Sequence, residues 1–120
     1  MKKKIYILDD NQSVCNAICF LFESMNFKTQ IYQDPIRFLE EYSKEEKGCL
    51  IVDLFMPSLN GLELIKTLKQ KNSALDIILI SGYVSEETKK QVMNEGAKVF
   101  LPKPLNIEIL LEEVCKILDK

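Results

Sequence analysis

Residues Cys49 to Val52 read CLIV, and Asp53 follows this apolar run directly. A short, β-branched run without polar alternation is typical of a strand that is buried on both faces of a parallel sheet. The sequence predicts four more strands, which are Lys4–Leu8 (KIYIL), Ile77–Ile80 (IILI), and the weaker candidates Thr29–Tyr32, a predicted edge, and Val99–Leu101.

Between these runs the apolar residues recur every three or four positions, which indicates helices with one face on the sheet. Asp34 before Pro35, Ser85 and Asn106 are predicted helix caps, and Gly96 is a predicted stop. Five strand-then-helix units predict an α/β fold, a (βα)5 doubly wound open parallel sheet with helices on both faces. The predicted apolar faces are Val14, Ile18, Leu21, Phe22 and Met25 in residues 12–25; Phe38, Leu39 and Tyr42; Leu62, Ile65 and Leu68; Val92 and Met93; and Leu110, Leu111, Val114 and Leu118.

The composition narrows the class of protein. The chain has 120 residues, 47% of them apolar, which predicts one globular domain over residues 1–120. No apolar run reaches the roughly 18 residues of a membrane span, and no signal peptide is evident, so we expect a cytoplasmic protein without membrane contact. With 16 basic and 18 acidic residues, no basic patch predicts direct nucleic-acid binding. The absence of histidine excludes His-based triads and His metal ligands.

Four cysteines could in principle form a zinc site. Cys15, Cys19, Cys49 and Cys115 lack paired short spacings, and three of them fall within apolar segments. We interpret them as reduced residues in or near the core.

Polar side chains follow the predicted strands at the points where the strands end. Asp9 and Asp10 follow the first strand, Asp53 the third, Ser81 the fourth and Lys103 the fifth. In doubly wound sheets, ligands bind outside the carboxyl ends of the strands, so these side chains can converge on one pocket. The pocket would hold three carboxylates, a hydroxyl and an ammonium group.

Three carboxylates in one small site require a counter-charge. At about 4 Å and an effective dielectric near 20, each like-charged pair repels by roughly 4 kcal/mol. With oxygen ligands only, the expected ion is Mg²⁺, or Mn²⁺ in its place. A carboxylate so placed can act as a nucleophile toward a phosphoryl group and form an aspartyl phosphate. An Asp-Asp pair alone is commonly a solvated loop, but an unpaired Asp53 closing an apolar run would be costly.

These residues occur in four short motifs whose joint order and spacing are specific. The motifs are Leu8-Asp9-Asp10-Asn11; Val52-Asp53-Leu54-Phe55-Met56-Pro57 with Gly61; Ser81-Gly82; and Phe100-Leu101-Pro102-Lys103-Pro104. With these motifs, the whole chain resembles the receiver domain of two-component response regulators. The resemblance implies a flavodoxin-like sheet with strand order 2-1-3-4-5.

The resemblance also implies the roles of the site residues. Asp53 would be the phosphoacceptor, and Asp9 and Asp10 would bind Mg²⁺ together with Asp53 and the carbonyl group of Phe55. The phosphoryl donor would be a phosphohistidine on a sensor histidine kinase or a phosphotransfer protein. The chain would then be no enzyme in the ordinary sense, but a phosphoacceptor that assists its own phosphorylation and dephosphorylation.

Ser81 and Lys103 would hold phosphoryl oxygens, and the Lys103-Pro104 bond would be cis. Ser81 and Phe100 would form the switch, with Ser81 moving toward the phosphoryl group and Phe100 turning inward. Phe100 lacks the hydroxyl group of the commoner tyrosine at this position, so packing alone would drive its movement. The predicted helix before it has few apolar residues, which supports mobility.

Two pairs of apolar residues lie where receivers meet partners or solvent. Ala17 and Phe20 lie off the buried face of the first predicted helix, which docks on the kinase in similar receivers, so we predict that they contact the kinase. Phe55 and Tyr83 lie two residues beyond Asp53 and Ser81. Both are large and could shield the acyl phosphate from water, which predicts slow self-dephosphorylation.

Two other classes of function remain open at this point. A phosphohydrolase of the haloacid dehalogenase kind requires a second acid two residues beyond its nucleophile, and neither Asp9 nor Asp53 has one there. A docking module that has lost its chemistry is disfavoured because all five site residues are present.

The output of the chain is a separate question. The sequence ends shortly after the fifth predicted helix, which leaves no room for an output domain. We therefore expect either a stand-alone regulator or the receiver of a longer protein, which could control transcription. A homodimer could form through the fourth and fifth helices and the fifth strand.

Overall fold

The computed structural model describes residues 4–43, 45–56, 58–82 and 84–118. In these residues five parallel strands form one sheet in the order β2-β1-β3-β4-β5, which confirms the predicted topology. The strands are β1 (Lys4–Leu8), β2 (Lys28–Tyr32), β3 (Gly48–Asp53), β4 (Leu75–Ser81) and β5 (Val99–Pro102).

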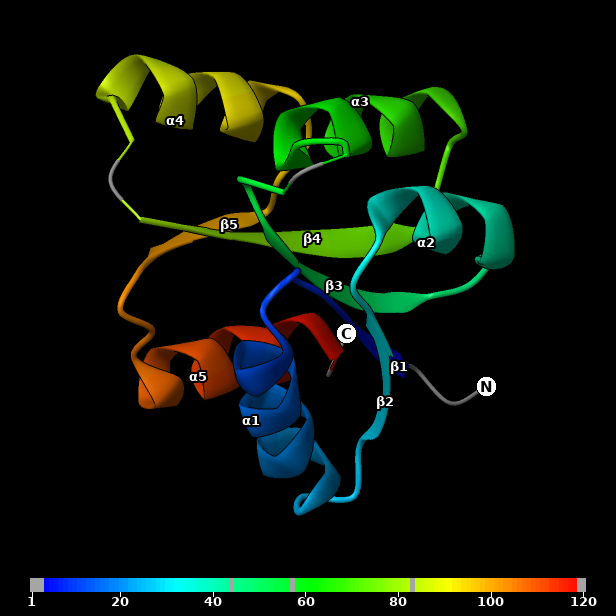
Figure 1. The fold of residues 1–120 in the computed structure, drawn as a ribbon, viewed down its shortest axis with the longest axis vertical. Helices are drawn as coiled ribbons and strands as arrows, with labels where there is room; N and C mark the ends of the chain where they lie inside the picture. Colours follow the sequence, from blue (N-terminus) through cyan, green and yellow to red (C-terminus); the bar gives the residue numbers. More distant parts are fainter. Residues whose placement is uncertain (1–3, 44, 57, 83, 119–120) are drawn as a thin grey trace.

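Five helices connect and follow the strands. In Figure 1, α2, α3 and α4 cover one face of the sheet, and α1 and α5 cover the other. This is the doubly wound arrangement that the alternating strand and helix patterns predict. The helices are α1 (Gln12–Glu23), α2 (Pro35–Glu41), α3 (Gly61–Gln70), α4 (Glu86–Asn94) and α5 (Ile107–Leu118).

Each helix begins at a polar side chain that accepts a hydrogen bond from the backbone of the first turn. Asp34, Ser85 and Asn106 do so at α2, α4 and α5, as predicted. Asn11 and Asn60 cap α1 and α3 in the same way, although our sequence analysis did not identify them. A short polar side chain thus caps the N-terminus of each of these five helices.

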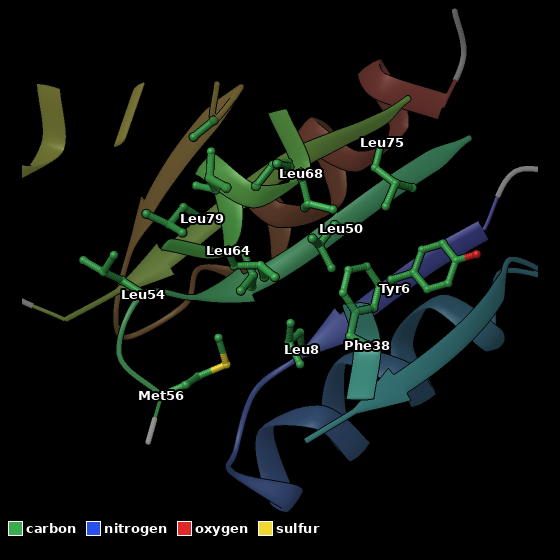
Figure 2. Close-up of a cluster of buried hydrophobic side chains, with 14 of the residues drawn as sticks. Tyr6, Leu8, Phe38, Leu50, Leu54, Met56, Leu64, Leu68, Leu75 and Leu79 are labelled. Atoms are coloured by element: carbon green, nitrogen blue, oxygen red, sulfur yellow. The ribbon is translucent and has the colours of Figure 1, made fainter. Parts of the chain in front are cut away.

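The sheet separates two apolar cores. Successive residues of β1 point to opposite faces, so Tyr6 and Leu8 join the core under α2, α3 and α4 (Figure 2), while Ile5 and Ile7 join the core under α1 and α5. Both faces of the central strands are therefore buried. This explains why their sequences are apolar without alternation.

The buried faces of two helices differ from the prediction. Met25 follows the end of α1 and is exposed, and the helix buries Cys15 together with Ile18 and Phe22. In α4, Val92 is buried and Met93 is exposed, because successive helical residues point about 100° apart. The predictions for Met25 and Met93 were therefore wrong.

The cysteines agree with the sequence analysis. All four are free; Cys15 and Cys49 are buried, and Cys19 and Cys115 are half-buried. Among the described helices, none combines the length and hydropathy that a membrane span requires.

Gly61 brings α3 close to the end of β3. A Cβ atom at this position would lie 2.9 Å from the Cα atom of Leu54 and 3.1 Å from the carbonyl oxygen of Asp53. The backbone N–H group of Gly61 donates to the carbonyl oxygen of Leu54 at 2.7 Å. The start of α3 is thus fixed against the chain that leaves Asp53.

Candidate functional site

Three carboxylates converge at the carboxyl ends of β1 and β3. Asp9 and Asp10 follow β1, Asp53 is the last residue of β3, and one carboxylate oxygen from each lies within 4.8 Å of the other two. Asp9 is 3% exposed and Asp53 is 7% exposed, whereas Asp10 is exposed. The adjacency of β1 and β3 in the sheet brings together residues that are more than forty positions apart in the sequence.

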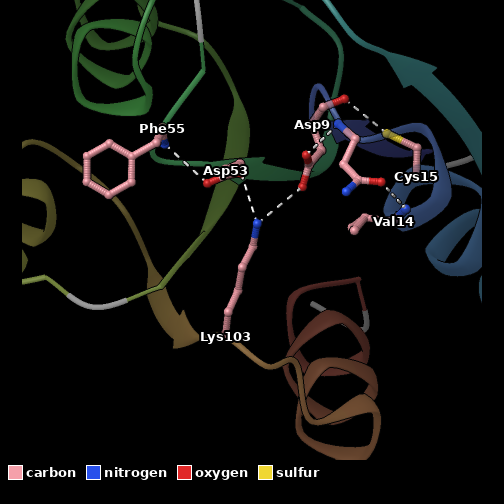
Figure 3. A network of polar contacts seen from close by, with 7 residues as sticks. Asp9, Val14, Cys15, Asp53, Phe55 and Lys103 are labelled. Atoms are coloured by element: carbon pink, nitrogen blue, oxygen red, sulfur yellow. Dashed lines mark hydrogen bonds and ion pairs between the residues drawn. The ribbon is translucent and has the colours of Figure 1, made fainter.

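Lys103 joins this cluster from the loop after β5. Its Nζ atom donates to Oδ2 of Asp53 at 3.0 Å and lies 3.8 Å from Oδ2 of Asp9 (Figure 3). Its backbone N–H group donates to the carbonyl oxygen of Ser81 at 2.7 Å, which anchors the loop to β4. The Lys103-Pro104 bond is cis. One ammonium group therefore neutralises part of the charge of two buried carboxylates.

The electrostatics of the cluster are visible in two pKa shifts. Burial raises the pKa of the Asp9 carboxyl above its ordinary value, and the charges of Asp53 and Asp10 raise it further, against the opposing effects of the Asn11 backbone and Lys103. For Lys103, burial acts to lower the pKa, but the hydrogen bond and charge of Asp53, together with the charges of Asp9 and Asp10, outweigh it, so the pKa is raised. The cluster thus favours an added positive charge.

Ser81, at the end of β4, is the predicted hydroxyl group of the site. The residue is fully buried, and its Oγ atom has no hydrogen-bond partner in the described part of the chain. A buried hydroxyl without a partner costs free energy unless a ligand or water supplies one. The unpaired hydroxyl, the ammonium group and the oxygen-only donor set therefore fit a divalent cation together with an anionic group.

Backbone donors orient the two buried carboxylates. Oδ1 of Asp53 accepts from the N–H group of Phe55 at 3.1 Å, and Oδ1 of Asp9 accepts from the N–H group of Asn11 at 2.9 Å. The thiol group of Cys15 donates to the carbonyl oxygen of Asp9 at 3.2 Å. Burial, followed by the charge of Asp9, raises the pKa of Cys15 to about 11, so this thiol stays protonated near neutral pH.

The other predicted residues surround the cluster. Phe55 is 60% exposed beside Asp53, and Phe20 on α1 is 78% exposed, with Ala17 also exposed on that helix. Phe100 on β5 is half-buried. Two predicted motif positions, Pro57 and Tyr83, lie outside the described residues.

Two contacts of the site were not predicted from the sequence. The Nζ atom of Lys89 on α4 lies 5.7 Å from the ring centroid of Phe100, a cation–π contact. The hydrogen bond of Cys15 was missed because we interpreted this cysteine only as a core residue. Neither contact has a local motif, because each joins two different elements of the fold.

Comparison with known proteins identifies the family. The sequence model of the family described as response regulator receiver domain matches residues 5–115, so the chain belongs to this family. This confirms the resemblance that the motifs indicate.

Named relatives agree with this assignment. The chain is 32% identical over 103 residues to the transcriptional regulatory protein FixJ of Bradyrhizobium diazoefficiens, a match that covers 86% of this chain and 50% of FixJ. The chain spans about half the length of the curated relatives it matches.

Two solved structures have the same fold. A response regulator receiver protein from Pseudomonas putida is 31% identical with a TM-score of 0.86, over 97% of this chain and 98% of that one. A response regulator from Burkholderia pseudomallei, solved with a phosphorylated aspartic acid and a calcium ion, is 26% identical with a TM-score of 0.82, over 94% of this chain and 66% of that one.

Family membership settles the general class of function. The chain is the receiver domain of a response regulator, a signalling domain of two-component systems rather than a classical enzyme. Receiver domains partner with histidine kinases and bind Mg²⁺ at an acidic cluster such as that of Asp9, Asp10 and Asp53. Membership of this family excludes the alternative that the chain is a phosphohydrolase of the haloacid dehalogenase kind.

Mutual repulsion in the cluster predicts that Asp10→Asn stabilises the metal-free protein. The substitution removes a charge that raises the pKa of Asp9 less than the charge of Asp53 does, and it also removes a weak attraction to Lys103, so the expected gain is small. Because Asp10 is exposed, the expected gain at pH 7 is up to about 1 kcal/mol in the free energy of unfolding. An acid with a raised pKa destabilises the fold as it ionises, so the gain should shrink as the pH falls toward 4, near the ordinary pKa of these carboxyls.

Thermal unfolding with and without Mg²⁺ measures both effects. Mg²⁺ should raise the Tm of the wild-type protein and raise that of Asp10→Asn much less. Glu40→Gln, which removes an exposed carboxylate on α2, is the control and should leave both values unchanged. A lower Tm for metal-free Asp10→Asn would contradict the expected repulsion.

Proposed function

We propose that residues 1–120 act as one receiver domain that accepts a phosphoryl group on Asp53 with the help of Mg²⁺ and thereby changes its interaction surface. The observation that carries this proposal is the position of the Asp53 carboxylate. One of its oxygen atoms lies within 4.8 Å of carboxylate oxygens of Asp9 and Asp10, and its Oδ2 atom accepts from the ammonium group of Lys103. Asp53 also pairs with Ile80 on β4, next to Ser81 with its unpaired hydroxyl group.

Asp53 is suited to act as the nucleophile. Two donors hold its carboxylate, the Phe55 N–H group at Oδ1 and the Lys103 ammonium group at Oδ2, so its direction is set before a donor arrives. A carboxylate oxygen forms the bond to phosphorus as the phosphorus–nitrogen bond of a phosphohistidine breaks. The electron pair leaves with the imidazole. The product is an aspartyl phosphate.

Asp9, Asp10 and Asp53 would hold the cation, with the carbonyl group of Phe55 as a further oxygen ligand. The bound Mg²⁺ would neutralise negative charge on the phosphoryl oxygens and on the three carboxylates. The phosphorylated aspartic acid and calcium ion in the related Burkholderia pseudomallei structure support this reading.

Lys103 and Ser81 would hold the phosphoryl oxygens. The Lys103 ammonium group already spans Asp53 and Asp9, so it can follow the negative charge from the carboxylate to the phosphoryl group. The hydroxyl group of Ser81 can donate to a phosphoryl oxygen, which would supply the partner that it lacks in the described residues.

The switch would connect Ser81 with Phe100. Phe100 has no hydroxyl group to hold it outward by a hydrogen bond, but the Lys89 ammonium group lies over its ring. Movement of Ser81 toward the phosphoryl group would free space for the ring, and the balance between inward packing and the contact with Lys89 would set the two populations. Because Val92 is the buried residue of α4, this helix can adjust with the ring.

The phosphoryl donor would be a sensor histidine kinase or a phosphotransfer protein. FixJ is named as a transcriptional regulatory protein, and this chain covers half of it. We therefore propose that the chain controls transcription if it is the receiver part of a longer regulator. A homodimer through α4, β5 and α5 remains a prediction.

Phosphorylation on Asp53 is tested with a small phosphodonor. After incubation with acetyl phosphate and Mg²⁺, the intact mass should increase by one phosphoryl group in the wild-type protein. Asp53→Asn should show no increase in mass because it lacks the nucleophile. A wild-type sample with a chelator should show none because it lacks the metal. An unmodified wild-type protein would support the docking-module alternative, and modification of Asp53→Asn would place the acceptor elsewhere.

Phe20→Ala should slow phosphotransfer from the cognate kinase by up to about tenfold, because an exposed aromatic residue at an interface often carries a large part of the binding energy. Its phosphorylation by acetyl phosphate should not change. Ile36→Ala, which removes an exposed apolar residue on α2, is the matched control. Equal rates of kinase transfer to the wild-type protein and Phe20→Ala would remove Phe20 from the interface.

Phe55→Asn should shorten the lifetime of the phosphorylated protein several-fold. The substitution removes an apolar cover beside Asp53 and introduces an amide that can orient an attacking water. Phe55→Leu, which keeps an apolar side chain, should retain most of the lifetime. The decay of the phosphorylated mass after removal of the donor gives the rate. Identical rates for Phe55→Asn and Phe55→Leu would contradict shielding by Phe55.

A further inference from the structure

The thiol group of Cys15 bonds directly to the backbone of the acidic loop. Cys15 lies in the first turns of α1, is fully buried, and donates from Sγ to the carbonyl oxygen of Asp9 at 3.2 Å (Figure 3). We propose that Cys15 is a positioning residue that fixes the Asp9-Asp10 backbone in the geometry needed for Mg²⁺ binding. This inference rests on the proposed function.

The backbone of Asp9 is held from two sides. Its N–H group donates to the carbonyl oxygen of Tyr32 on β2 at 3.3 Å, and its carbonyl oxygen accepts from Cys15. In the described part of the chain, no other donor reaches this carbonyl oxygen. The Asn11 N–H group also holds Oδ1 of Asp9, at 2.9 Å, but the thiol is the described contact that holds the carbonyl oxygen. The thiol therefore helps to fix the peptide plane between Asp9 and Asp10.

The orientation of that peptide plane determines the direction in which the side chains of Asp9 and Asp10 leave the backbone. These two side chains carry two of the three carboxylates. Asp9 is 3% exposed, so loss of the thiol leaves a buried carbonyl oxygen without a partner. The loop can relieve this cost by rotating the peptide toward another donor. Such a rotation shifts the carboxylates of Asp9 and Asp10 relative to Asp53, which is fixed on a central strand. Metal affinity falls when ligands move by about half an ångström.

A purely structural role for Cys15 makes a different prediction, and Cys49 separates the two. Cys49 is also fully buried in the core under α1 and α5, and it lies on β3 four residues before Asp53. Within the described residues, its thiol has no hydrogen bond to the acidic loop. Truncation of Cys49 therefore also removes a buried thiol group from this core, but it does not free the Asp9 carbonyl group.

The experiment compares Cys15→Ala, Cys15→Ser and Cys49→Ala with the wild-type protein. Isothermal titration with Mg²⁺ alone gives the affinity, and thermal unfolding in the absence of metal gives the stability. Cys15→Ala should bind Mg²⁺ about tenfold more weakly, the lower end of the range for groups that orient metal ligands. Cys15→Ser keeps a donor and should remain within about threefold of the wild-type affinity. Cys49→Ala should lose stability and keep its Mg²⁺ affinity.

Three results would overturn the proposal. These are an unchanged affinity in Cys15→Ala, an equal loss of affinity in Cys15→Ala and Cys49→Ala, or a failure of serine to restore binding. If Cys15→Ala does not fold, Cys15→Val fills the space without a donor and takes its place in the comparison. A wild-type protein that binds no Mg²⁺ would overturn the proposed function as well, whereas normal wild-type binding with an unaffected Cys15→Ala would overturn this inference alone.

Discussion

The structure depends on a balance of charge at the carboxyl edge of the sheet. Two buried carboxylates and one exposed carboxylate lie within 4.8 Å of one another, and one ammonium group contacts the two that are buried. Burial and the neighbouring charges raise the pKa of Asp9, so the folded chain bears a cost at this site. Such cost is typical of functional sites, where local strain is tolerated because the rest of the fold is stable.

The two apolar cores allow the site to carry this cost. The central strands are buried on both faces, and the neighbouring packing holds Asp53 and Ser81 at the ends of rigid strands. Ser81 is the part of the proposed switch that lies on such a strand, and its hydroxyl group would turn toward the phosphoryl group. The rest of the proposed switch is packed less tightly, since Phe100 is on the short edge strand β5 and Lys89 is on α4, where Val92 is the buried residue. The well-packed central strands can hold a phosphoryl group in place, while the less tightly packed residues change position in response to it.

The proposed positioning by Cys15 gives α1 two roles, one in the buried core and one on the surface. One turn of this helix supports the acidic loop from inside the core, and a later turn presents Phe20 on the surface. The helix expected to meet the kinase therefore also supports the site that receives the phosphoryl group.

The sequence by itself determined the strands and helices of this protein and which polar side chains converge at one edge of the sheet. Apolar runs predicted the strands of Ile5 and Ile51, caps such as Asp34 and Ser85 predicted helix starts, and the polar residues after the strands predicted the convergence of Asp9, Asp53 and Lys103. These features follow from local periodicity and from the rule that parallel strands end at one edge. Only the tertiary structure decided that Met25 and Met93 are exposed, that Cys15 bonds to Asp9, and that Lys89 lies over Phe100. Such contacts depend on where a helix ends and how it sits on the sheet, and distances between separate elements have no counterpart in the local order of residues.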